Sequence, residues 1–181
     1  MTRFDAQPAH LADAVVRLAP LREPDFEPLY AVASDPLLWA QHPNPDRHRR
    51  DVFRVFFDGA MASRGALLVR DATTDAIVGC SRYYDHDPAD RSVLIGYTFV
   101  ARSRWGTGVN PALKRLMLEH AFREVDRVLF HIGEHNRRSQ VAIGRLGARK
   151  IAEKDVAYFG EAIHRNFVYE IGKADWPPRT G

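Results

Sequence analysis

A loop with two glycines, WGTGVN at residues 105–110, is the stretch of this sequence best suited to hold an anionic ligand. The first turn of a helix leaves N–H groups without intrahelical acceptors, and these groups carry a partial positive charge. Glycine lets the backbone approach a ligand closely, so a loop of this kind can bind phosphate oxygens. Arg102, Arg104, Lys114 and Arg115 supply cations nearby. The loop is therefore a candidate phosphate site.

The flanking residues predict a strand before this loop and a helix after it. Val93 to Val100 is rich in β-branched and aromatic residues, and Pro111 to Phe122 repeats apolar residues at helical spacing. Asn110 is expected to cap this helix, with Pro111 as its first residue. The loop lacks the Gly-Lys-Ser/Thr of a nucleotide-binding P-loop and the third glycine of a dinucleotide fingerprint. An ordinary tight turn between strand and helix is the alternative interpretation.

A second strand and helix follow, and groups that can move protons lie between them. Val125 to Ile132 predicts a strand, and residues 136–148 predict a helix. His131, Glu134 and His135 lie where the strand gives way to the helix. A histidine with its ordinary pKa near 6.5 can act as a base at neutral pH. The alternatives are a hydrogen-bonded strand histidine and a carboxylate that only stabilises the start of the helix.

With both units in place, the sequence resembles the GNAT superfamily of N-acetyltransferases. It is most similar to the branch that contains the ribosomal-protein-alanine acetyltransferases, in which WGxGxA opens the helix that binds acetyl-CoA and NxxS…LGA follows. Here these motifs are residues 105–110, Asn136, Ser139 and LGA at residues 146–148. The resemblance spans about residues 15 to 171 and implies an α/β (α+β) fold. A single mixed, mostly antiparallel sheet would be flanked by helices, with two central parallel strands splayed apart.

The resemblance also implies that acetyl-CoA binds as co-substrate where these two strands separate. Backbone groups of Phe99 and Val100 would bind the pantetheine arm as an added strand does. Asn136 and Ser139 would face the thioester. The residues predicted to hold the pyrophosphate are Arg104, Trp105, Gly106, Thr107, Gly108, Val109 and Asn110.

Acetyl transfer to nitrogen needs a neutral amine and a proton or hydrogen bond for the departing thiolate. His131 lies five residues before Asn136, where some relatives carry a catalytic glutamate, and Glu134 is the second candidate base. Ser139 stands where the branch has its proposed acid serine, with a plain helix cap as the alternative. The predicted catalytic residues are thus His131, Glu134 and Ser139.

Three positions depart from the pattern of the family. Asn110 is larger than the residue usual at the end of the loop, Leu94 stands where many relatives have glutamate, and Ile143 stands where tyrosine is frequent. The last two motivate a second hypothesis, a CoA-binding module without catalytic activity. A third hypothesis, a basic protein associated with RNA or the ribosome, comes from the arginine-rich residues 47–50 and 137–138. Solvated faces are the alternative interpretation of those runs.

The resemblance implies that the acceptor is a primary amine, either a protein N-terminus or a small molecule, and the sequence does not choose between them. Trp39 and His42 lie in a proline-bounded connection, and an amphipathic helix follows over residues 46–64. These two residues are predicted to border the acceptor pocket. Alternatively, both residues only hold this connection in place.

The remaining segments complete the predicted order β-α-α-β-β-β-α-β-α-β-β. One domain is expected over residues 15–172, between a loose arm at 1–14 and a disordered tail at 173–181, with a turn at residues 85–88. The other predicted strands are residues 15–21, 66–70, 76–84, 150–158 and 163–171, and a further helix opens at Pro24.

Composition agrees with one domain in the cytoplasm. The chain has 181 residues, 45% of them hydrophobic, and a formal net charge of +3 that suits an anionic cofactor. Cys80 is the only cysteine, which excludes an intrachain disulfide and a cysteine metal cluster. It stands in an apolar run and is expected to be buried. We expect no metal, membrane or nucleic-acid partner; the oligomeric state stays open, a homodimer included.

Overall fold

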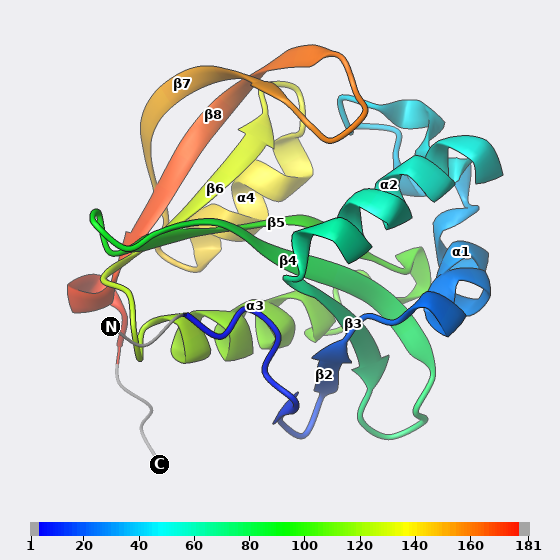
Figure 1. Cartoon of the computed structure of the whole chain (residues 1–181), viewed down its shortest axis with the longest axis horizontal. Helices are drawn as coiled ribbons and strands as arrows, with labels where there is room; N and C mark the ends of the chain where they lie inside the picture. Colours follow the sequence, from blue (N-terminus) through cyan, green and yellow to red (C-terminus); the bar gives the residue numbers. More distant parts are fainter. Residues whose placement is uncertain (1–3, 178–181) are drawn as a thin grey trace.

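One sheet of eight strands runs through the molecule in the order β1-β2-β3-β4-β5-β6-β8-β7. This computed structural model describes residues 4–177. The β5–β6 pair is parallel, and the other neighbouring pairs are antiparallel. From β2 onward, the strands and α-helices follow the predicted order (Figure 1). The strands are β1 (Leu11–Ala12), β2 (Val16–Pro20), β3 (Ala66–Asp71), β4 (Ile77–Asp87), β5 (Ser92–Val100), β6 (Arg127–Gly133), β7 (Arg149–Ala157) and β8 (Ile163–Gly172).

Two pairs of helices cover the two faces of this sheet. On one face, α1 (Phe26–Ala33) and α2 (Arg50–Ser63) bury an aromatic core, because the phenylalanines of α2 recur at helical spacing. On the other face, α3 (Val109–Ala121) and α4 (Arg137–Arg145) pack on a mainly aliphatic core. Figure 1 shows α2 and α3 on opposite sides of β4 and β5. In the described part of the chain, none of the helices has the length and apolar character needed to cross a bilayer.

The parallel strands β5 and β6 separate soon after they pair. Their register runs only from Ser92↔Arg127 to Leu94↔Leu129, while β6 stays paired with β8 along its length. Tyr97 has a φ of +52°, and around it the pairing of β5 with β4 is out of register. Such a bulge bends one strand away from its neighbour. The predicted splay of the two central strands is therefore confirmed.

The N-terminal arm is packed where the structure describes it, contrary to the expectation of a loose segment. Phe4 is buried and meets the Tyr83 ring edge to face at 5.2 Å between centroids. Strand β1 pairs with β2 and extends the sheet. The segment is short and polar, so its sequence alone has no period that would predict this packing.

Two further predictions are wrong. Residues 85–87 continue β4 instead of forming a turn. Trp176, predicted to lie in a disordered tail, packs on Phe122 with 6.2 Å between ring centroids, and a short 3-10 helix (Lys173–Asp175) precedes it. Residues 178–181 of that predicted tail lie outside the described part of the chain.

Candidate active site

The loop before α3 takes a conformation that depends on its glycines. Gly106 and Gly108 have φ values of +73° and +89°, in the left-handed region that side chains disfavour. Gly108 is the N-cap, and α3 begins at Val109. Asn110 and Pro111 are therefore the second and third helical residues, so the prediction of Asn110 as the cap is wrong. Proline is tolerated there because N–H groups of the first turn have no intrahelical acceptor.

The N–H groups of this loop face outward. Thr107 donates to the Arg104 carbonyl through its N–H, at 3.4 Å, and through its hydroxyl, at 2.7 Å. A Cβ built on either glycine would meet nothing within 4 Å, so open space lies beside the loop. Within residues 4–177, no acceptor partners the N–H groups of Gly106, Gly108, Val109 and Asn110. The residues present thus fit an anionic group such as a pyrophosphate.

The cations around the loop differ from those expected. The Arg104 guanidinium pairs with Asp71 at 3.1 Å, and Arg102 pairs with the carboxylate that follows α1. Arg138, from α4, instead lies over the Trp105 ring, 3.9 Å from its centroid. The positive charge beside Trp105 therefore comes from the second helical unit.

Near its end, the backbone of β5 presents an N–H group to the gap where β5 and β6 separate. Ala101 donates to the Val78 carbonyl of β4 at 2.7 Å, and groups of alternate residues point to opposite edges of a strand. The backbone of Phe99 accordingly faces β4, and that of Val100 faces away from it. The Val100 carbonyl already accepts from Trp105 Nε1 at 2.9 Å. Of the two residues predicted to bind the pantetheine arm, only Val100 presents a free N–H group to the gap.

A cavity of about 120 Å³, here called the central cavity, lies where β5 and β6 diverge. Asn136, at the predicted start of this helix, caps α4 through its Oδ1, which accepts from the Ser139 N–H at 3.2 Å. Ser139 lines the cavity, and its hydroxyl has no hydrogen-bond partner in the described part of the protein. Ile143 closes the same wall. A free hydroxyl and a helix start therefore converge on this space.

Lys114, expected only as a cation beside the loop, lies in the wall of the central cavity. It is 6% exposed, and its Nζ donates to Thr98 Oγ1 at 2.5 Å. No carboxylate of residues 4–177 forms an ion pair with it. Burial lowers the pKa of Lys114 from 10.5 to about 7. The sequence held one signal of this burial, because Lys114 lies three residues before the buried Met117 on the apolar face of α3.

His131 and Glu134 have different surroundings, although both were predicted as candidate bases. His131 lines the central cavity and is half-buried, with its Nδ1 buried and unpartnered. Burial, and next Lys154, lower its pKa below 6.5, opposed by Asp85. Its imidazole is therefore neutral at neutral pH and can accept a proton. Glu134 is exposed beyond the end of β6, and its carboxylate lies 3.5 Å from His135.

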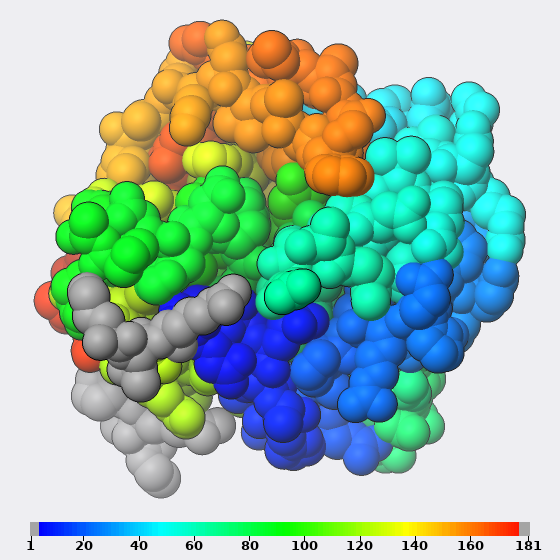
Figure 2. Space-filling model, viewed as in Figure 1, coloured from blue at the N-terminus to red at the C-terminus, as the bar shows by residue number. Residues whose placement is uncertain are grey.

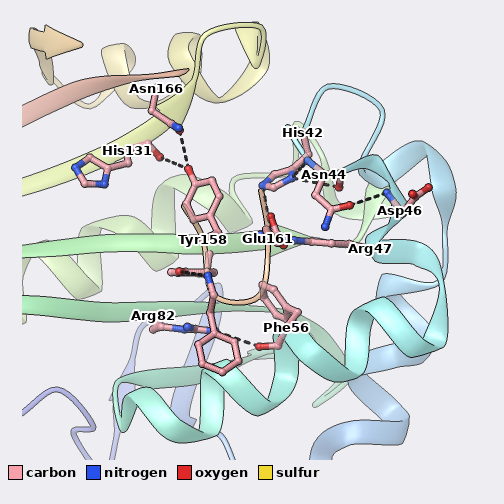
Figure 3. A network of polar contacts seen from close by, with 12 residues as sticks. His42, Asn44, Asp46, Arg47, Phe56, Arg82, His131, Tyr158, Glu161 and Asn166 are labelled. Carbon is pink, nitrogen blue, oxygen red and sulfur yellow. Dashed lines mark hydrogen bonds and ion pairs between the residues drawn. The ribbon is translucent and has the colours of Figure 1, made fainter. Parts of the chain in front are cut away.

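Of the two predicted acceptor residues, His42 lies beside a buried ion pair that Arg47 forms with Glu161 (Figure 3). The Arg47 side chain is 2% exposed, and its Nε donates to Glu161 at 2.6 Å, so the solvated face expected for this arginine is wrong. His42 Nε2 lies 3.1 Å from Arg47 and lines the central cavity. Burial and then Arg47 hold the pKa of His42 well below 6.5. Trp39 is 2% exposed and packs behind this group, with its indole N–H bonded to the Ala33 carbonyl at 2.8 Å.

A second cavity of about 570 Å³, here called the outer cavity, opens beside the first. It lies among α2, β4 and the end of β7, on the face where the orange and teal segments meet the green strands in Figure 2. Tyr97, His131 and Tyr158 line both cavities. The Tyr158 hydroxyl donates to Asn166 Oδ1 at 2.8 Å, and this bond fixes its ring in the shared wall. The shared wall is where two reactants bound on opposite sides would meet.

In the described part of the chain, neither Cys80 nor the side chains that could bind a metal ion form a further site. Cys80 is buried, as expected, and burial raises the pKa of its thiol to about 12, which makes it a poor nucleophile. Among residues 4–177, no three His, Cys, Asp or Glu side chains are placed to share a metal ion.

Comparison with known proteins agrees with this geometry. The family described as the acetyltransferase (GNAT) domain matches residues 16–149. The structure is similar to an N-acetyltransferase related to GCN5 from Brucella melitensis, with a TM-score of 0.81, 18% identity, and coverage of 93% of this chain and 80% of that chain. A protein from T. thermophilus described as a candidate acetyltransferase has a TM-score of 0.77 and 25% identity, over 98% and 94% of the two chains.

A third similar structure is RimJ of Mycobacterium smegmatis in complex with CoA-disulfide, with a TM-score of 0.71 and 20% identity over 97% of this chain and 87% of that one. Comparison with curated proteins gave no match. Because the family match covers most of the chain, the protein belongs to the GNAT acetyltransferase domain family. That membership implies acetylation with acetyl-CoA as the co-substrate.

Proposed function

We propose that this protein is an N-acetyltransferase that moves an acetyl group from acetyl-CoA to a primary amine by direct attack in a ternary complex. The observation that carries the proposal is the separation of β5 from β6 after Leu94 and Leu129. It opens the central cavity in line with the unpartnered N–H groups at the start of α3. This arrangement suits a long, anionic thioester whose reactive end must reach the interior of the protein.

In this proposal, each part of the site has one task. N–H groups at Gly106 and Gly108 bind the pyrophosphate, each such bond being worth roughly 1.5–3 kcal/mol. The Val100 N–H binds the pantetheine arm as a neighbouring strand would. The co-substrate supplies an activated acyl group. The Ser139 hydroxyl donates a hydrogen bond to the departing sulfur, and His131 accepts the proton that the attacking amine loses.

The kind of amine decides how much help the base must give. A lysine-like amine with a pKa of about 10.4 must lose its proton at a cost of about 4.6 kcal/mol at pH 7. An α-amine with a pKa of about 7.7–8.0 costs only about 1 to 1.4 kcal/mol. His131 is neutral, and its pKa lies below 6.5, so it is a weak base. The site therefore suits an α-amine better than a lysine-like amine.

A CoA-binding module without catalytic activity is the second candidate. Ile143 lines the central cavity where many relatives have a tyrosine, so no phenol from that position reaches the sulfur. Leu94 is 7% exposed and packs in the core, where many relatives have a glutamate. Ser139 and His131 must supply both proton-transfer roles if catalysis occurs.

A thiol-release assay separates the two candidates. Acetyl-CoA is incubated with the protein and a panel of peptides with free N-termini, free amino acids, polyamines and aminoglycosides, and free CoA is measured. Amine-dependent release that Ser139→Ala slows supports the transferase. Thermal stabilisation by CoA without release by any amine would favour the binding module.

A further inference from the structure

Three cations are buried in the described part of the protein, and they are not equally compensated. Arg47, Arg82 and Lys114 are each no more than 6% exposed. Arg47 forms an ion pair with Glu161, so that pair is neutral as a unit. Lys114 can release its proton because its pKa is about 7. Arg82 keeps its charge, since arginine does not deprotonate in proteins.

Arg82 has no carboxylate partner within residues 4–177. Its guanidinium lies 3.8 Å over the Tyr97 ring and donates to the Phe56 carbonyl at 3.3 Å, while its Nε is buried and unpartnered. The guanidinium also lies 5.6 Å from the centroid of the Phe56 ring. The attraction of aromatic rings for a cation is weaker than the cost of burying a charge without a counter-ion. The two rings and one carbonyl therefore leave the charge of Arg82 undercompensated.

The undercompensated charge lies against the outer cavity, together with a second free donor. Arg82 and Tyr84 both line this cavity, because alternate residues of β4 point to the same face. The Tyr84 hydroxyl is buried without a partner and lies 3.1 Å from the position of a Cβ built on Gly96. Figure 3 shows Arg82 beside α2, next to Phe56. The buried end of the cavity thus offers hydrogen-bond donors and one positive charge.

We propose that the outer cavity binds acceptor amines that carry a carboxylate group, with Arg82 and Tyr84 as the ligands of that carboxylate. The inference rests on the proposed acetyl transfer and names the substrate class of the same site. One carboxylate matches the single buried charge, whereas a dianionic phosphate would leave a negative charge in excess. The phosphate groups of CoA would bind at the start of α3, and α3 lies on the opposite face of the sheet from α2, which borders the outer cavity (Figure 1).

The position of the outer cavity also determines where the amine of the bound acceptor lies. A carboxylate on Arg82 lies beside Tyr97, and Tyr97 forms part of the wall shared with the central cavity. His131 belongs to the same wall, so the amine end of a short acceptor meets the base there. A volume of about 570 Å³ is in the range of small-molecule sites. Free amino acids and similar compounds carry the required amine and carboxylate.

Matched ligands test the inference without requiring catalysis. The thermal midpoint of the protein saturated with CoA is measured with a series of L-amino acids and with their carboxamides, which lack the carboxylate charge. We expect at least one amino acid to stabilise the protein with at least tenfold lower Kd than its carboxamide. Equal affinities across the series would overturn the inference.

Variants assign the effect to the proposed residues. Arg82→Met should weaken binding of the preferred amino acid tenfold to a hundredfold and leave its carboxamide unaffected, and Tyr84→Phe should weaken it about tenfold. Arg145→Met, at an exposed arginine of α4, should change neither affinity. An unchanged preference in Arg82→Met and Tyr84→Phe would overturn the assignment. If Arg82→Met does not fold, Tyr84→Phe and the ligand series decide.

The same ligands distinguish this inference from the proposed function. Carboxylate preference that depends on Arg82, without release of thiol from acetyl-CoA, would support the binding site and contradict the transferase. Thiol release at equal rates with amino acids and carboxamides would support the transferase and contradict the carboxylate site.

Discussion

Lys114 makes the stability of the ligand-free protein depend on pH in a way that Lys114→Met should abolish. Its pKa falls from 10.5 to about 7 on folding, because the amine is buried beside Thr98 without a carboxylate. Between these two values, the unfolded chain holds a proton that the folded chain has released. The free energy of unfolding therefore rises with pH in this window. The cost of burying Lys114 is full below about pH 7 and vanishes above about pH 10.5.

The magnitude follows from the same pKa change. One pKa unit corresponds to 1.36 kcal/mol, so lowering the pKa from 10.5 to about 7 costs at most about 5 kcal/mol. Between pH 7 and about pH 8.5, the wild type should gain about 2 kcal/mol of unfolding free energy from this residue. Cys80, whose ordinary pKa is 9.0, titrates in the unfolded chain mostly above pH 8.5. His42, with a pKa lowered from 6.5, titrates below pH 7.

Urea unfolding at pH 7, 7.5, 8 and 8.5 measures this effect. Lys114→Met should be more stable than the wild type at pH 7 and should lose most of the rise with pH. Loss of the bond to Thr98 shifts the whole curve without changing its slope. Lys173→Met, at an exposed lysine, should keep the wild-type slope. Parallel pH curves for the wild type and Lys114→Met would refute the reasoning.

Four further substitutions test other parts of the account. Gly108→Glu should abolish CoA binding, measured by calorimetry, because a carboxylate replaces open space beside the phosphate donors; wild-type affinity would exclude the loop. His131→Ala should lower kcat/KM most at pH values between the lowered pKa of His131 and the pKa of the amine, where His131 is neutral and most of the amine must lose a proton, and approach wild type above the pKa of the amine; a profile of unaltered shape excludes it as the base. Ser139→Ala should lower kcat at least tenfold with little change in the Kd of CoA, and loss of affinity alone would leave it a cap. Glu161→Gln should cost roughly 3 kcal/mol or more in urea unfolding, because it leaves a buried guanidinium unpaired, whereas the exposed Glu153→Gln should cost under about 1 kcal/mol.

The sequence predicted the elements whose patterns are local. Helix α3 and strand β5 follow from apolar spacing, and the helix predicted from residue 136 onward is α4, which Asn136 caps. The error at Asn110 has a local cause as well. Asparagine followed by proline favours a cap, but the positive φ of Gly108 lets the helix begin earlier.

The side-chain environments could not be predicted, because they depend on distant partners. Arg47 stands in a basic run that suggests a solvated face, yet it meets Glu161, which is 114 residues away. Arg82 looks like a polar strand residue until α2 covers that face. The burial of these two arginines is settled by the tertiary contacts and leaves no periodic signal in the sequence.

The central claim is that free backbone N–H groups at the start of α3 bind the pyrophosphate of the co-substrate and direct its thioester into the gap between β5 and β6. The most direct measurement is a titration of the ¹⁵N-labelled protein with acetyl-CoA, followed by amide NMR. Saturable downfield shifts of the Gly106, Gly108 and Asn110 amide protons, together with a shift at Val100, are predicted. Saturable binding that leaves these four amides unmoved would contradict the claim.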